Sequence, residues 1–132
     1  MIKPARIHVR FSDLDVLGHV NNTIYLSYFE IARVHYFGQL LGTDWDWKKD
    51  GVILVKNEVE YIKPVFLHHE PFVHLFVQEI GTKSYKLSYE LHVNDELYTK
   101  GASVLVCFDS IKNETIPIPE RMLEGLKKLK KE

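Results

Sequence analysis

Hydrophobic and polar residues alternate at the start of the chain and then change to a helical spacing. Between residues 5 and 12, apolar side chains occupy every second position, which predicts a half-buried strand. From Asn21 or Asn22 to Gly42, apolar residues recur every three to four positions, which predicts a long helix. Asn is a favoured N-cap residue, and Gly commonly follows a helix C-terminus. The residues at this spacing are Tyr25, Tyr28, Phe29, Ala32, Tyr36 and Leu40.

Further apolar residues fall outside that stripe, so we expect apolar contacts around much of the helix, as in a helix wrapped by a sheet. These residues are Ile24, Leu26, Ile31, Val34 and Phe37.

From Val52 onward the pattern is typical of strands. Short turn-like links separate the apolar runs, and short links favour antiparallel neighbours. The four predicted strands cover residues 52–62, 71–80, 84–93 and 97–108. Residues 119–132 predict a short C-terminal helix, because Pro suits a first helical position and lysines suit a helix end. The chain is therefore expected to be an α+β protein, with an antiparallel sheet of about five strands around a long helix.

Composition limits the possible partners. A chain of 132 residues, 45% of them hydrophobic, is expected to form a single domain over residues 1–132. Its net charge of −1 creates no overall field that would recruit nucleic acid or an anionic membrane. No segment approaches the about 20 apolar residues that span a bilayer, and residues 1–4 do not resemble a secretory signal. We expect a cytoplasmic protein without nucleic-acid or membrane partners.

Candidate chemistry is concentrated between the predicted first strand and the long helix. There, Asp13-x-Asp15-x-x-Gly-His19-Val-Asn-Asn22 brings two carboxylates and a histidine to a helix N-terminus. Such an end offers unpaired N–H groups and a partial positive charge, and it can hold an oxyanion. Taken alone, both aspartates could instead be simple turn residues, because Asp favours loops and helix starts.

This segment, followed by Tyr25, Glu30 and Arg33, resembles that of the hotdog-fold acyl-CoA thioesterases of the 4-hydroxybenzoyl-CoA thioesterase-like family. Residues 61–64 and 101–106 add weaker support. The resemblance implies a hotdog fold and hydrolysis of an acyl-CoA, or an acyl-ACP, to free acid and thiol without a cofactor. The acyl group would be fatty or otherwise apolar. The resemblance also implies a homodimer or a dimer of dimers, with the acyl chain between subunits.

The resemblance assigns roles to individual residues. Asp15 matches the catalytic carboxylate, which acts as nucleophile or general base, and the backbone amide of Asn22 matches the oxyanion hole. His19 is a second catalytic candidate, because it matches the histidine of an Asp-x-Asn-x-His set in fatty acyl-ACP thioesterases. Leu17 stands where that set has Asn, which favours Asp15 as the principal group. Asp13 is expected to be a structural partner in the turn.

Substrate contacts are expected at three further residues. Tyr25 is a core residue that is also a candidate for contact with the substrate. Lys83 and Ser84, in a predicted hairpin, match the position at which related enzymes hold the nucleotide part of CoA, although a solvated lysine is the ordinary condition of such a turn. Glu30 and Arg33, three residues apart, share one helix face and are expected to have a structural or subunit-contact role.

Other polar residues have simpler explanations. Cys107, in an apolar run, is expected to be a small buried hydrophobe. His68 and His69 point to opposite sides if they are extended, and they lack the ligand spacing of a known metal site, so no metal is expected. The main alternative function is a non-catalytic acyl-CoA or fatty-acid binding module, because a fold alone does not establish catalysis. A hotdog dehydratase ranks last, because it would show a different His/Asp or His/Glu pairing.

Overall fold

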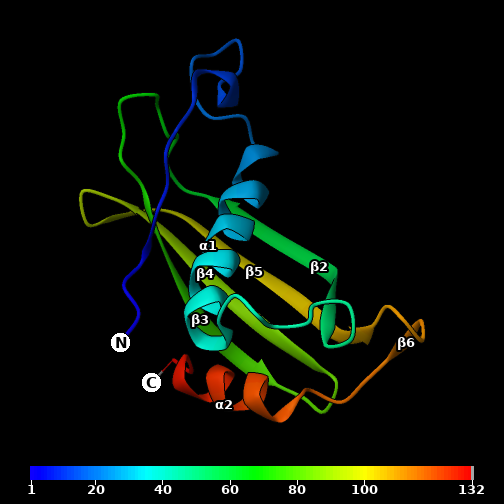
Figure 1. Ribbon diagram of the computed structural model, residues 1–132. Coiled ribbons are helices and arrows are strands. Elements are labelled where there is room, and N and C mark those ends of the chain that lie inside the picture. Colours follow the sequence, from blue (N-terminus) through cyan, green and yellow to red (C-terminus); the bar gives the residue numbers. More distant parts are fainter. Residues whose placement is uncertain (132) are drawn as a thin grey trace.

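A long helix lies along one face of a curved antiparallel sheet in the computed structural model, which describes residues 1–131 (Figure 1). The strands follow the order β1-β3-β4-β5-β2, and β6 pairs with β5. The elements are β1 (Ala5–Arg6), the 3₁₀ turn η1 (Phe11–Asp13), α1 (Ile24–Leu41), β2 (Gly51–Tyr61), β3 (Phe72–Ile80), β4 (Ser84–Val93), β5 (Glu96–Asp109), β6 (Glu114–Thr115) and α2 (Glu120–Lys128). This is the α+β arrangement that the resemblance to the hotdog fold implies.

The four long strands agree with the sequence prediction to within one or two residues, but the predicted strand over residues 5–12 is largely wrong. Only Ala5 and Arg6 pair with β3. The chain then turns, because the Asp13 carboxylate accepts the Arg10 N–H at 3.0 Å and η1 forms. Phe11, expected on the buried side, is 81% exposed as a result.

The start of α1 lies slightly later than predicted. The Asn21 Oδ1 atom accepts the Thr23 N–H at 3.0 Å and the Thr23 hydroxyl at 2.8 Å, so Asn21 does cap the helix start. Regular helix begins at Ile24 and ends at Leu41. Gly42 terminates it with a φ of +80°, a left-handed conformation that favours glycine, and its N–H donates to the Gly38 carbonyl at 3.0 Å.

One face of α1 packs on the concave face of the sheet. Alternate side chains of β4 point into this core, as expected for a strand with one buried face. Phe29 of α1 stacks on Tyr89 of β4, with ring centroids 4.4 Å apart. Gly101 of β5 lies directly beneath, where a Cβ atom would come within 2.4 Å of the Phe29 ring. The helix and the sheet therefore approach closely at this point.

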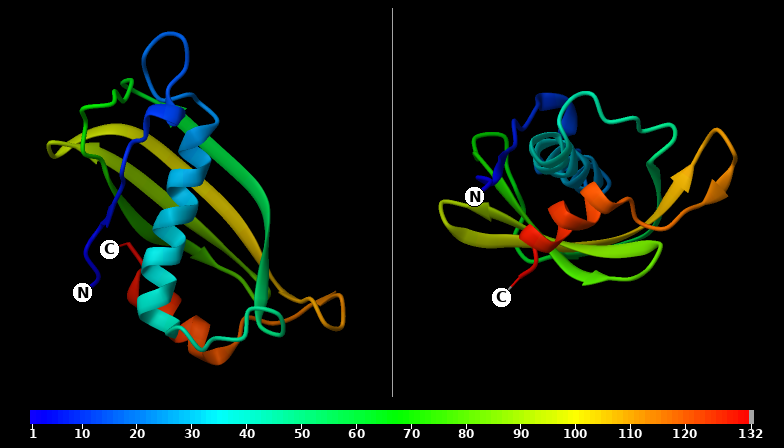
Figure 2. Two further views of the ribbon diagram at one scale, coloured as in Figure 1. Left: turned by 45° about the horizontal axis from the view of Figure 1, so that its top comes forward. Right: turned by 60° about the horizontal axis from the view of Figure 1, so that its bottom comes forward.

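The opposite face of α1 carries exposed apolar side chains. Ile31 is 47% exposed and Val34 is 70% exposed. The expectation of apolar contact around much of the helix is therefore wrong for a single chain, because the sheet curves around one side of α1 (Figure 2).

The chain termini cover the edge of β3. β1 pairs with its first residues, and Val77 exchanges hydrogen bonds with the tail, at 2.9 Å to the Leu129 carbonyl and 3.3 Å from the Lys131 N–H. α2 begins after Pro119 as predicted but ends at Lys128, before the predicted end at residue 132, which lies outside the described residues. Within residues 1–131, no helix has the length and apolar composition needed to cross a bilayer.

Candidate active site

The Asp15 loop is a tight hairpin closed by its own backbone. The Asp15 N–H donates to the His19 carbonyl at 2.9 Å, and the Gly18 N–H donates to the Asp15 carbonyl at 3.0 Å. Gly18 has a φ of +85°, which a side chain would disfavour. The Asp15 carboxylate accepts the Leu17 N–H at 2.9 Å, and its side chain is 26% exposed. The loop thus holds a carboxylate that solvent can reach in a defined orientation.

His19 lies beside Asp15 without a direct hydrogen bond. Its Nδ1 atom is 4.0 Å from the Asp15 Oδ1 atom, and its ring meets Phe66 edge-on at a centroid distance of 5.7 Å. The structure therefore brings together the two residues that the sequence singled out, at a separation that one bound group could bridge.

Asp13 is buried and tied to its surroundings on several sides. Its carboxylate accepts hydrogen bonds from the Arg10 backbone and side chain and from the Tyr28 hydroxyl, the last at 2.7 Å. Burial alone would raise the pKa of Asp13, but these hydrogen bonds outweigh it and lower the pKa below the ordinary value. Burial and the Asp13 carboxylate raise the pKa of Tyr28. Asp13 therefore anchors the loop to α1, in agreement with the structural role expected for it.

The turn leading into α1 is held by hydrogen bonds on both sides of the Asn22 N–H. The Asn21 N–H donates to the Asp13 carbonyl at 2.9 Å, and the Asn22 carbonyl accepts the Tyr61 hydroxyl at 2.7 Å. Among residues 1–131, the Asn22 N–H has no acceptor. An unpaired N–H at a helix start, where the helix dipole is positive, is suited to binding an oxyanion.

Tyr25 lies under this turn, with 2% of its surface exposed, and its ring meets that of Tyr61 at a centroid distance of 5.0 Å. Burial is the main cause that raises the pKa of Tyr25, and the nearby negative charge of Asp15 adds to it. The aromatic ring of Tyr25 therefore belongs to the core.

Lys83 and Ser84 lie far from Asp15 within one chain. Lys83 ends the β3–β4 turn and Ser84 begins β4, at the end of the sheet next to α2, whereas the Asp15 loop lies at the opposite end (Figure 2). The Ile118 N–H, just before α2, donates to the Thr82 carbonyl at 3.0 Å. The Lys83 Nζ atom contacts the Thr115 hydroxyl at 3.3 Å.

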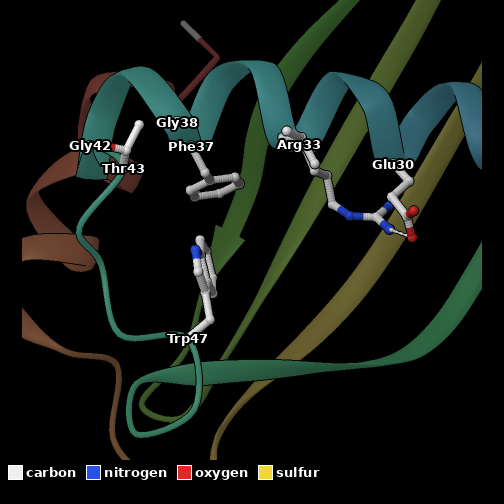
Figure 3. A pocket seen from close by; sticks show the side chains of 8 residues that line it. Glu30, Arg33, Phe37, Gly38, Gly42, Thr43 and Trp47 are labelled. Carbon is white, nitrogen blue, oxygen red and sulfur yellow. Dashed lines mark ion pairs between the residues drawn. The ribbon is translucent and has the colours of Figure 1, made fainter.

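A cavity of about 500 Å³ opens beside the C-terminal half of α1. Phe37 and Trp47 face each other across it, and Arg33 points toward Glu30, its ion-pair partner at 3.8 Å (Figure 3). Arg33 also donates to the Tyr89 hydroxyl at 2.9 Å. The predicted placement of Glu30 and Arg33 on one helix face is confirmed. The aromatic walls were not predicted, because no local pattern joins Phe37 to a loop residue ten positions later.

Residues suited to metal binding do not gather in the described part of the chain: no group of three or more His, Cys, Asp or Glu side chains within residues 1–131 could hold an ion. Cys107 is fully buried beside the Met122 sulfur, and burial raises the pKa of its thiol to about 11. The prediction of a small, buried cysteine is confirmed.

Comparison with known proteins identifies the family. The model of the thioesterase-like superfamily matches residues 9–126. A putative esterase from Aquifex aeolicus is 31% identical over 126 residues, which cover 92% of this chain and 95% of that protein. Matches to two other curated relatives span 56% and 49% of those proteins' own lengths.

Solved structures agree over nearly the whole chain. A predicted thioesterase from Bacillus stearothermophilus superposes with a TM-score of 0.87 at 28% identity, covering 97% of this chain and 96% of the other. A thioesterase from Thermus thermophilus, solved with coenzyme A and Zn, superposes with a TM-score of 0.83 at 37% identity. The match covers 95% of this chain and 91% of the other. These matches indicate thioester hydrolysis as the class of reaction. The chain has the hotdog fold and belongs to the thioesterase-like superfamily.

Proposed function

We propose that this protein hydrolyses acyl-CoA thioesters, with Asp15 as the reacting carboxylate and the Asn22 N–H as the oxyanion donor. The observation that carries the proposal is an accessible carboxylate on the loop before α1, followed in the turn into the helix by the Asn22 N–H, which has no acceptor among residues 1–131. Thioester cleavage requires both an attacking oxygen and donors for the negative oxygen that forms.

Two routes use the same groups. In the first, an Asp15 oxygen attacks the thioester carbonyl carbon, the C–S bond breaks, CoA leaves as the thiolate, and water hydrolyses the resulting anhydride. In the second, Asp15 takes a proton from water, which attacks the carbonyl carbon; the C–S bond then breaks, and the departing CoA thiolate regains a proton. Both routes yield the free acid and the thiol, and in both the carbonyl oxygen becomes negative opposite the Asn22 N–H. His19 would contact the same carbonyl oxygen or Asp15.

CoA is the carrier that the comparisons favour. The Thermus relative was solved with coenzyme A, and this chain has no excess of basic residues for an acidic carrier protein, since its net charge is −1. We therefore propose an acyl-CoA substrate, with acyl-ACP as the alternative. Tyr25, under the turn that leads into α1, would form the floor of the part of the site that holds the acyl group. Lys83 and Ser84 would bind the phosphates and nucleotide.

A homodimer would bring the Asp15 loop of one chain close to Lys83 and Ser84 of the other. β2 is a terminal strand of the sheet path, and the apolar face of α1 and the side chains of β2 beside it are exposed. Antiparallel pairing of two β2 strands about a two-fold axis would bring the Tyr61 end of one chain next to the Gly51 end of the other. The Phe37–Trp47 cavity, Lys83 and Ser84 would then approach the partner's Asp15. A dimer of dimers would keep this contact.

The direct test is release of free thiol from a panel of acyl-CoAs by purified protein. Asp15→Asn is isosteric, and its amide oxygen can still accept the Leu17 N–H, so the loop should survive. We expect a loss of about a thousandfold or more in kcat, because no ionised oxygen remains. The matched comparison is Asp46→Asn, because the Asp46 carboxylate accepts the Lys48 N–H at 3.0 Å in an equivalent turn at the other end of α1.

Full activity in Asp15→Asn would refute the proposed role of the carboxylate. If calorimetry detects acyl-CoA binding but the wild-type protein releases no thiol from any substrate, the chain is a non-catalytic binding module.

A further inference from the structure

The last residue of β2 holds the segment that leads into α1. The Tyr61 hydroxyl donates to the Asn22 carbonyl at 2.7 Å, a contact between residues 39 positions apart in the sequence. Its ring rests edge-on against that of Tyr25, at an interplanar angle of 80°. Tyr61 is thus fixed by its strand and by a buried aromatic neighbour, and it presents its hydroxyl to the turn.

We propose that Tyr61 is a positioning residue that orients the Asn22 N–H toward the oxyanion. This inference rests on the function proposed above and adds a residue from a different element to the site. Tyr61 acts through the backbone of Asn22 and does not touch the reacting atoms.

The hydrogen bonds around Asn22 explain why this contact matters. On one side, the Asn21 N–H is bound to the Asp13 carbonyl at 2.9 Å. On the other, the Asn22 carbonyl is bound by Tyr61. The Asn22 N–H lies between these two anchors, and its direction depends on the backbone torsions on either side of it. The Asn21 carbonyl, in the same peptide group as the Asn22 N–H, still accepts the Ile24 N–H at 2.9 Å when the Tyr61 bond is lost. Loss of Tyr61 would therefore loosen the Asn22 carbonyl and tilt the N–H without freeing the turn, and even a small tilt weakens its interaction with a negative oxygen, which depends strongly on geometry.

The chemistry of Tyr61 suits this role. A phenol hydroxyl that donates to a carbonyl must stay protonated, and burial raises the pKa of Tyr61 above its ordinary value of 10.0. The anchor therefore persists throughout the neutral range. With 44% of its surface exposed, Tyr61 contributes less to the core than the fully buried Tyr25, so loss of its hydroxyl should leave the fold intact.

The test compares Tyr61→Phe with Tyr98→Phe. Tyr98 lies nearby on β5, and among residues 1–131 its hydroxyl has no hydrogen-bond partner, so it controls for loss of a phenol oxygen alone. Tyr61→Phe should lower kcat about tenfold, consistent with the loss of one hydrogen bond. It should change KM, and the affinity for a nonhydrolysable acyl-CoA analogue, less than twofold. Tyr98→Phe should leave all three unchanged.

A second measurement does not depend on activity. In Tyr61→Phe, amide hydrogen exchange of the segment around Asn22 should be faster, while the melting temperature stays within about 2 °C of the wild type. An unchanged kcat, or a fall in kcat that simply follows a loss of folded protein, would overturn the inference. If Asp15→Asn abolishes turnover and Tyr61→Phe does not slow it, only the role of Tyr61 fails. If the wild-type protein shows no turnover, the proposed function fails first.

Discussion

The hydroxyl of Tyr28 donates a 2.7 Å hydrogen bond to the buried carboxylate of Asp13, 15 positions earlier in the chain. This contact joins the first two turns of α1 to the segment that precedes the Asp15 loop. Together with the bond from the Asn21 N–H to the Asp13 carbonyl, it makes Asp13 the fixed point around which the candidate site is arranged. Three predictions concern the Asp13 hydrogen bonds, the packing of α1 against the sheet and the proposed homodimer.

Replacement of Asp13 should change stability and its dependence on pH. The folded-state pKa of Asp13 lies below the ordinary value of 3.8. The ionised group therefore contributes its full stabilisation above that ordinary value, and the contribution is lost as the pH falls through the folded-state pKa. Asp13→Asn should lower the free energy of unfolding at pH 7 by about 2 kcal/mol, because charged hydrogen bonds are replaced by weaker ones.

Urea unfolding at pH 7 and pH 3 checks this. The difference between Asp13→Asn and the wild type should narrow at the lower pH, because pH 3 lies below the ordinary pKa of 3.8, so the unfolded chain then binds a proton at Asp13. Equal stability at pH 7 would show that the Asp13 hydrogen bonds do not contribute.

Two glycine substitutions should have opposite effects. Gly101→Ala would place a Cβ atom 2.4 Å from the Phe29 ring, which is itself stacked on Tyr89, so we expect a loss of about 1–3 kcal/mol. Gly38→Ala meets nothing within 4 Å and lies inside α1, so alanine should stabilise the helix by up to about 1 kcal/mol. Chemical denaturation measures both. Equal effects of the two variants would contradict the close approach of Gly101 to Phe29.

The exposed face of α1 should control assembly. Val34 is 70% exposed on this face. If the proposed homodimer forms, Val34→Glu should shift it to monomer, because the interface would bury an unpaired charge. Sedimentation velocity over a range of concentrations detects the change. Phe72→Glu is the control, because Phe72 is also exposed, at 39%, but lies on β3, away from β2. A wild-type protein that stays monomeric at all concentrations would rule out the dimer.

The elements that sequence predicted well are those specified by local patterns. The four long strands follow from alternation and from turn residues between them, and α1 follows from its spacing and from Asn21 and Gly42. The strand over residues 5–12 was overestimated, because its alternation is real but the Asp13 carboxylate turns the chain at Arg10. The alternation of apolar residues does not reveal this hydrogen bond between a side chain and the backbone, so it did not indicate where the strand ends.

The sequence predicted those residues of the candidate site that lie close together along the chain. Asp15, His19 and Asn22 lie within eight successive residues, so their spacing alone assigns them to one loop and the helix start that follows it. The contact between Tyr61 and Asn22 and the Phe37–Trp47 cavity join distant segments, so no spacing indicates them. The catalytic and binding roles, the single domain over residues 1–132 and the cytoplasmic location stay predictions.

The covered edge of β3 limits how copies of this chain can add to one another. Its first residues are bonded to β1 and its middle to the C-terminal tail, so an incoming strand would find those backbone groups already occupied. Sheet extension is then left to β2. In the proposed homodimer, both copies would use this same edge, so the sheet could not extend beyond two chains, and edge-to-edge growth into fibres would be blocked.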